Sequence, residues 1–206
     1  ASQKDRTLMF VPSKVVANGY EEVLQTQGEN YHYEGKKLAK GTDFVMVKYK
    51  PTAWIEKEDG KWEMNKTRKD TSEAVKYCGI STMAAKSIMV VGDDDGAFAL
   101  KPLGKGLEFT PLAKPDAIKK DAPIRFKLTR DGQPVKQAKV FGSFGGFSSN
   151  DETSVAFYAT TDLKGEFEFK ALKEGLWYLK TTVNTDSGDK NCEIFNDKAS
   201  LSFMVR

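Results

Sequence analysis

The chain has 206 residues, of which 39% are hydrophobic and 30% are charged, so its composition is that of a globular protein rather than a disordered one. Its 32 basic and 29 acidic residues are mixed along the sequence and leave a formal net charge of +3. No basic stripe of the kind that follows a phosphate backbone stands out, so nucleic acid is not an expected partner. No apolar run approaches the ~20 residues of a membrane-spanning helix, so no transmembrane segment is expected.

The first half of the chain shows short strand patterns separated by turns. The stretch "RTLMFVPSKVV" is typical of two short strands around a Pro-Ser turn, and further strands are expected at 21–25 and 43–49. In "TAWIEKEDGKWEM", Asp59-Gly60 is a strong turn signal between two arms that each contain a tryptophan. This segment therefore predicts a β-hairpin.

The middle of the chain has a mixed pattern. We expect a short helix that Thr71 or Ser72 caps and that runs through Tyr77, followed by a strand at 86–91. The stretch "GDDDGAFALKPLGKG" at 92–106 is rich in turn-forming residues. It is the best candidate for a domain junction.

The pattern becomes more regular after this junction. A strand is expected at 107–112, and the alternation in "IRFKLTRDGQPVKQAKVFG" predicts a strand with Phe126 on its apolar face and a turn at Asp131-Gly132. The stretch "SVAFYATTD" is expected to pair with "GEFEFKAL" as a late hairpin, in which Phe167, Phe169 and Leu172 share one face. Trp177, just after that hairpin, or its neighbours are expected to fill the core.

Six or seven short strands at regular spacing, with turn signals between them, are typical of a β-sandwich of ~100 residues. We therefore predict a mainly β protein. An amino-terminal β-rich domain, smaller or less regular, is expected over residues 1–103, and a carboxy-terminal antiparallel β-sandwich over residues 104–206.

The two cysteines, Cys78 and Cys192, leave two alternatives. They form one disulfide, which would close a loop of more than half the chain and stabilise it by roughly 4 kcal/mol on the chain-entropy model, or they are two buried thiols. Neither has a partner at Cys-x-x-Cys spacing, so a structural zinc site is not expected. The chain begins "ASQKDRT" without methionine, which fits removal of a signal peptide or a trimmed chain.

Two segments contain candidate metal ligands. His32 in "NYHYEG" is the chain's one histidine and the first candidate to bind Ni(II), Co(II) or Cu(II), the alternative being a surface or packing role. Asp93, Asp94 and Asp95 form an acidic turn of the kind that Ca²⁺ sites use, although the EF-hand spacing is absent and a solvated turn is the alternative.

Motifs for catalysis are missing from the sequence. There is no Gly-x-Ser-x-Gly elbow, no P-loop and no dinucleotide fingerprint, and any Ser-His-Asp arrangement would have to use His32. No pair of carboxylates stands out as a general acid and base. We therefore expect a protein that is not an enzyme.

Several segments together resemble one bacterial family. The succession "KPLGKGLEFTPLAKP", "FKLTRDGQPVKQAKVF", "ATTDLKGEFEF" and "KEGLWYLKTTV", with the upstream "VKYKPTAWIEKEDGKW", is similar to periplasmic proteins labelled as periplasmic components of ABC-type nickel or cobalt transport, and otherwise as a domain of unknown function. The resemblance covers about Gly41 to Arg206. Where many members have histidines, this chain has Ala1-Ser2-Gln3 and Lys105.

The resemblance implies an exported, non-catalytic protein of the periplasm. Its carboxy-terminal sandwich would be like that of transthyretin-type or carboxypeptidase-regulatory domains, within an immunoglobulin- or transthyretin-like fold class. The function it implies is that of a binding or accessory protein associated with nickel or cobalt uptake, with a membrane transport complex or another envelope protein as partner. The alternative is a structural or interaction module of a cell-envelope assembly that binds no metal.

Overall fold

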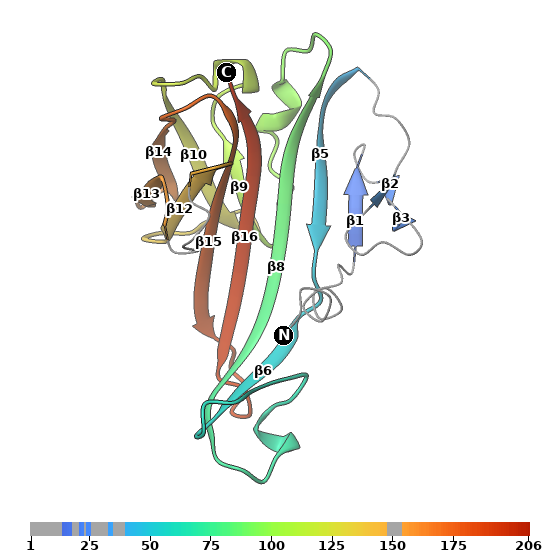
Figure 1. Cartoon of the computed structure of the whole chain (residues 1–206), viewed down its shortest axis with the longest axis vertical. Helices are drawn as coiled ribbons and strands as arrows, with labels where there is room; N and C mark the ends of the chain where they lie inside the picture. The colour runs from blue at the N-terminus through green and yellow to red at the C-terminus, as the bar shows by residue number, and fades with distance from the viewer. Residues whose placement is uncertain (1–13, 18–20, 23, 26–32, 35–39, 148–153) are drawn as a thin grey trace.

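The computed structural model describes residues 40–147 and 154–206, together with the backbone of four short strands at 14–17, 21–22, 24–25 and 33–34 (Figure 1). These residues form two main β-sheets that pack face to face, and further short strands in the amino-terminal part. The fold is mainly β, which confirms the predicted class of an antiparallel β-sandwich with an additional amino-terminal β unit.

The larger sheet has ten strands and runs the full length of the molecule. Its main path, from one edge to the other, is β13 (Phe157–Thr160), β12 (Lys139–Phe144), β15 (Gly175–Asp186), β16 (Ile194–Val205), β8 (Val75–Val91), β5 (Gly41–Lys48), β1 (Lys14–Ala17) and β2 (Glu21–Glu22). The hairpin of β6 (Thr52–Lys57) and β7 (Trp62–Met64) joins the first part of β8.

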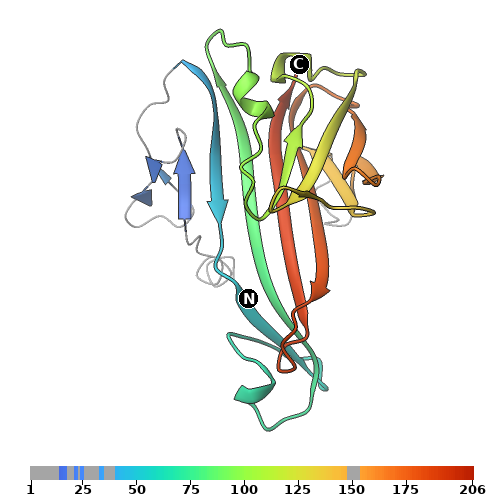
Figure 2. The same ribbon diagram turned by 180° about the vertical axis from the view of Figure 1, so that it is seen from behind.

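The smaller sheet covers one end of the larger one (Figure 2). Its strands are β9 (Leu107–Pro111), β10 (Pro123–Arg130), β11 (Gln133–Pro134) and β14 (Glu166–Lys170). A separate pair consists of β3 (Leu24–Gln25) and β4 (Tyr33–Glu34), and three short 3₁₀ helices are η1 (Arg68–Asp70), η2 (Ala97–Leu100) and η3 (Pro115–Ala117). None of the helices in the described part of the chain is long and apolar enough to cross a membrane.

The core lies between the two sheets, where the alternation of the strands directs apolar side chains inward. Phe126 on β10 packs against Phe203 on β16 with 5.2 Å between ring centroids. Trp177 on β15 is fully buried, and its Nε1 donates a hydrogen bond of 2.7 Å to the carbonyl of Lys173. The predicted core positions of Phe126 and Trp177 are confirmed.

One long strand joins the two halves of the chain. β8 has 17 residues and pairs in parallel with β16, from Gly79 beside Ile194 to Ser87 beside Ser202. The larger sheet therefore contains strands from both sides of the expected junction at residues 92–106. The division into domains 1–103 and 104–206 stays a prediction, and any boundary would cut across this shared sheet.

The expected helix ending at Tyr77 is wrong. The helical turn lies earlier, in η1, where Thr67 and Asp70 form a reciprocal capping box. β8 begins at Val75, and its first residues pair with β6. Backbone pairing with a neighbouring strand has overridden the weak capping signal of Thr71 and Ser72.

The expected pairing of "SVAFYATTD" with "GEFEFKAL" is also wrong. β13 pairs with β12 in the larger sheet, whereas β14 pairs with β10 in the smaller sheet. Between them Thr161 holds the chain, because its hydroxyl donates to the Val135 carbonyl and accepts from the Ala138 N–H. The segment thus crosses from one sheet to the other, and Leu172, which lies beyond the end of β14, is exposed rather than on its apolar face.

Two predicted turns are confirmed. β6 and β7 form the expected hairpin, closed by a hydrogen bond of 2.9 Å from the Lys57 N–H to the Lys61 carbonyl. β10 and β11 turn at Asp131-Gly132, where both residues have positive φ angles, 49° and 79°. Such angles match the type I′ hairpin turn that Asp-Gly favours.

Candidate functional site

A groove lies where the inner face of the larger sheet emerges from beneath the smaller sheet. Figure 2 shows that the long strands continue well past the ends of β9 and β10. The groove has a volume of about 870 Å³, within the range of roughly 300–1,000 Å³ typical of ligand sites. We call it the inner-face groove; the residues that define it here are Met46, Lys48, Thr82, Ala84, Leu103, Lys105, Gly106, Leu107, Arg130, Asp131, Thr185, Asp186, Phe195 and Asp197.

The floor of the groove follows from strand alternation. Ala84 on β8 lies beside Lys48 on β5 and Ala199 on β16, and Ala199 is part of the core between the sheets. Residues two positions apart share a face of a strand, so Thr82 and Asp197 also lie on this inner face. The same face that forms the core under the smaller sheet therefore becomes the floor of the groove beyond it.

An ion pair crosses the groove from one sheet to the other. Arg130, the last residue of β10, donates from Nε to Oδ2 of Asp197 on β16 over 3.1 Å. The side chain of Asp197 is only 10% exposed and that of Arg130 is 27% exposed. Burial raises the pKa of Asp197, whereas the charges of Arg130 and, more weakly, Lys48 act in the opposite direction.

Arg130 has bonding capacity left over. Its Nη2 is buried and has no hydrogen-bond partner among the residues that the structure describes. Leaving a buried donor of a charged group unpaired costs free energy, about 1–3 kcal/mol or more. Asp197 therefore holds the guanidinium in the groove but does not use all of its hydrogen-bond donors.

A second ion pair, fully buried, holds one wall of the groove. Nζ of Lys86 lies 3.1 Å from Oε2 of Glu108, and both side chains are 5% exposed. The Glu108 carboxylate also accepts backbone hydrogen bonds from Leu103 at 3.1 Å and Gly104 at 2.7 Å. Burial lowers the pKa of Lys86, although Glu108 opposes this effect. The pair fixes the loop that precedes β9.

The same loop is tied to the β10–β11 turn. The Gly106 N–H donates to Oδ1 of Asp131 over 2.8 Å, and the Asp131 N–H donates to the Gly106 carbonyl over 3.0 Å. Lys105 lies between these anchors with its side chain exposed, and no hydrogen bond or ion pair joins it to another described residue. A fixed backbone thus presents one uncommitted ammonium group at the wall.

The groove combines an apolar floor with charges of both signs. The cationic side chains are Lys48, Lys105 and Arg130, and the anionic ones are Asp131, Asp186 and Asp197. Such a surface is suited to binding a partly apolar ligand with a polar end. Sequence reasoning missed it, although Lys86 and Asp197 gave a signal: each is a charged residue that shares the inward face of its strand with apolar residues.

Comparison with known proteins identifies the family. The model of a domain of unknown function (DUF4198) matches residues 3–185. The chain belongs to this family. No curated protein and no solved structure matches the chain. The family description agrees with one of the two labels of the resembling family, that of a domain of unknown function, and it names no ligand.

Of the predicted metal ligands, Asp93, Asp94 and Asp95 lie among the described residues. His32 lies outside the described residues. Within those residues, no group of three or more histidine, cysteine, aspartate or glutamate side chains could hold a metal ion. Nickel and cobalt favour nitrogen ligands such as imidazole, whereas the nitrogens of the groove belong to lysine and arginine. The groove residues therefore do not fit either metal.

The acidic turn at Asp93–Asp95 lies beyond the end of β8, away from the groove. Asp94 accepts hydrogen bonds from the Thr42 hydroxyl and the Gly96 N–H, which lower its pKa in that order. Asp95 accepts from the Ala97 N–H and from Nζ of Lys114, and its pKa is lowered too. These bonds hold the turn together; the use of the turn by a metal stays a prediction.

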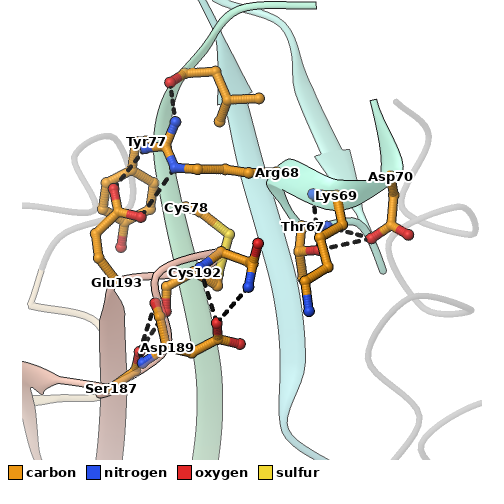
Figure 3. The surroundings of a disulfide bond; sticks show 12 residues. Thr67, Arg68, Lys69, Asp70, Tyr77, Cys78, Ser187, Asp189, Cys192 and Glu193 are labelled. Atoms are coloured by element: carbon orange, nitrogen blue, oxygen red, sulfur yellow. Dashed lines mark hydrogen bonds and ion pairs between the residues drawn. A yellow bond between two sulfur atoms is a disulfide. The ribbon is translucent and has the colours of Figure 1, made fainter. Parts of the chain in front are cut away.

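Cys78 and Cys192 form a disulfide across a sequence separation of 114 residues. It joins β8 to the loop that leads into β16 (Figure 3). Beside it Arg68 forms a two-point ion pair with Glu193, with Nη2 to Oε1 at 2.6 Å and Nε to Oε2 at 3.1 Å. The surroundings consist of links between segments and indicate a structural role.

Proposed function

We propose that this protein is a non-catalytic binding or accessory protein of the periplasm, and that the inner-face groove is its ligand-binding surface. The observation that carries the proposal is the Arg130–Asp197 pair, set over an apolar floor in a cleft of about 870 Å³. Ligand sites commonly combine such an apolar surface with a few polar groups that orient the ligand.

The cost of the buried charges supports this role. Replacing a buried ion pair with well-packed apolar residues is often neutral or stabilising, so stability alone does not explain why charges are kept. Here the buried pair Lys86–Glu108 holds the wall of the cleft, and the partly buried pair Arg130–Asp197 spans it. We infer that these charged residues are kept because they hold the groove in shape and provide polar groups for a ligand.

The disulfide supports the proposed location. Disulfides form and persist in oxidising compartments such as the bacterial periplasm, and are rare in the cytosol. The bond between Cys78 and Cys192 is buried, which is typical of a structural disulfide rather than a redox-active one. Export to the periplasm, as the family resemblance implies, would give the chain the environment in which this bond forms.

A more specific hypothesis is that this binding or accessory protein is associated with nickel or cobalt uptake. Its support is the resemblance to periplasmic components of nickel or cobalt transport, in which a membrane transport complex would be the partner. Because the groove residues do not fit these metals, any binding of nickel or cobalt by this chain would depend on His32, its one histidine.

A pair of neighbouring alanines allows a matched test of the groove. Ala84 lines the groove, whereas Ala85 has its side chain on the opposite face of β8 because strand residues alternate. Nile red, a neutral dye that fluoresces in apolar clefts, is titrated into the wild type, Ala84→Phe and Ala85→Phe. We expect the wild type and Ala85→Phe to bind the dye, and Ala84→Phe to lose most of the binding.

The possible results separate the two candidate functions. Equal binding by both variants would show that the dye does not use the groove and would contradict the proposal. An absence of binding by all three proteins would favour the alternative, an interaction module of a cell-envelope assembly. Circular dichroism checks that both variants keep the β fold, and fractionation of cells that express the full-length precursor tests the periplasmic location.

A further inference from the structure

We propose that the inner-face groove binds an amphipathic monocarboxylate, with its carboxylate at Arg130 and Lys105 and its apolar chain along the floor. This inference rests on the proposed function, because it assigns a ligand class to the same groove. The evidence is that hydrogen-bond donors lining the groove are left without protein partners, whereas its carboxylate acceptors already have such partners.

The donors are not used up by the protein itself. Arg130 contacts Asp197 through Nε, its Nη2 has no partner among the described residues, and its side chain as a whole is 27% exposed. Lys105 has no hydrogen-bond or ion-pair partner in that part of the chain. A guanidinium and an ammonium group at one end of a cleft recognise a carboxylate through charge-assisted hydrogen bonds.

The acceptors, by contrast, already have protein partners. Asp197 accepts from Arg130, Asp131 accepts from the Gly106 N–H at 2.8 Å, and Asp186 accepts from the Gly188 N–H at 2.8 Å. The carboxylates therefore hold the groove and its turns together. The unused hydrogen-bonding groups, on Arg130 and Lys105, are donors, so a carboxylate, which accepts hydrogen bonds, complements them better than an ammonium group, which only donates them.

The apolar floor of the groove is suited to the alkyl chain of the ligand. Met46, Ala84 and Phe195 offer apolar surface from the larger sheet, and the buried Leu107 borders it from the smaller sheet. Burying apolar surface contributes about 25 cal/mol per Å², so an alkyl chain on this floor adds affinity that a short carboxylate such as acetate lacks. The two features together specify an amphipathic acid rather than a simple anion.

Four probes of matched size or charge test this assignment. Octanoate, octan-1-ol, octylamine and acetate are each titrated into the wild type at pH 7 by calorimetry and by displacement of Nile red. We expect octanoate to bind at least about tenfold more tightly than the alcohol or the amine, since a charge-assisted hydrogen bond is worth that factor or more. Acetate is expected to bind too weakly to displace the dye.

Variants then locate the carboxylate. Lys105→Gln should weaken octanoate about two- to fivefold, as expected for an exposed charge. The double variant Arg130→Met/Asp197→Asn, which removes both charges of the ion pair, should weaken octanoate about tenfold or more and leave octan-1-ol unchanged. Lys119→Gln, an exposed lysine outside the groove, is the matched control and should bind octanoate like the wild type.

Each other outcome overturns the inference. If octylamine bound as tightly as octanoate, the aspartates would bind an ammonium group as well as the cations bind a carboxylate. If octan-1-ol bound as tightly as octanoate, the groove would not recognise the charged head group. Binding of octanoate that Lys105→Gln and the double variant leave unchanged would place the acid elsewhere. If octanoate fails while Nile red still distinguishes Ala84→Phe from Ala85→Phe, the ligand class is wrong but the proposed function stands.

Discussion

Single residues decide the shape of the groove, and Glu108 is the one on which most depends. It neutralises the buried Lys86 and accepts two backbone hydrogen bonds from the wall loop. Glu108→Gln would leave a buried ammonium group without its counter-charge. We expect a loss of about 3 kcal/mol or more in the free energy of unfolding, measured by urea denaturation.

The control for this change is Glu168→Gln, because Glu168 is an exposed residue on β14. Its substitution should alter the free energy of unfolding by no more than about 0.5 kcal/mol. Equal effects of the two substitutions would show that the buried pair is not what holds the loop.

His32 is the residue on which the metal hypothesis depends. Nickel and cobalt favour imidazole nitrogen, and this chain has one histidine. If the wild type binds Ni(II) or Co(II) in calorimetric titrations, His32→Ala should weaken that binding at least about tenfold, whereas Tyr33→Phe should not. Unchanged affinity in His32→Ala would remove His32 from the site, and an absence of binding by the wild type would count against a metal function.

At the scale of elements, the crossing from β13 to β14 depends on Gly165. Its φ angle is +74°, and a Cβ atom there would lie 2.6 Å from the Leu128 carbonyl oxygen. Gly188 has a similar φ of +73° but open space around it. We expect Gly165→Ala to cost at least about 1–2 kcal/mol more than Gly188→Ala in thermal or urea unfolding, because only the former adds a clash to the backbone strain.

The link between η1 and the loop before β16 should depend on pH. Arg68 lowers the pKa of Glu193, so this carboxylate stabilises the fold above its ordinary pKa, and that contribution is lost as the pH falls through the lower, folded-state value. The two side chains are 32% and 43% exposed, so solvent screening limits the effect to about 0.5–1 kcal/mol.

Glu193→Gln should therefore reduce the free energy of unfolding at pH 7, and this reduction should shrink as the pH falls from the ordinary glutamate pKa of about 4.3 toward the lowered pKa of the folded state. Urea unfolding at pH 7 and pH 3 measures this, with the exposed Glu174→Gln as control. A difference between Glu193→Gln and the wild type that does not shrink in acid would contradict the assignment to the ion pair.

At the scale of the whole molecule, the disulfide limits the freedom of the unfolded chain. Its sequence separation of 114 residues spans most of the described structure. On the chain-entropy model a loop of this size contributes roughly 4–5 kcal/mol. The double variant Cys78→Ala/Cys192→Ala should lose most of that stability in urea unfolding, and adding a reductant to the unfolding wild type should reproduce the loss. Ile55 packs with the two cysteines in a small buried cluster. A double variant as stable as the wild type would show that the packing of this cluster suffices without the bond.

The alternation of apolar and polar residues by itself determined that this protein is mainly β, and it placed Phe126 and Trp177 in the core and turns at Asp59-Gly60 and Asp131-Gly132. These features depend on neighbours within a few residues, so a short stretch of sequence contains the information. The extent of β8 and the crossing from β13 to β14 depend instead on distant partners. For the same reason only the tertiary structure brought Arg130 to Asp197 and Lys86 to Glu108. Each pair joins residues far apart in the chain, and which strands meet is decided by the packing of the two sheets rather than by local pattern.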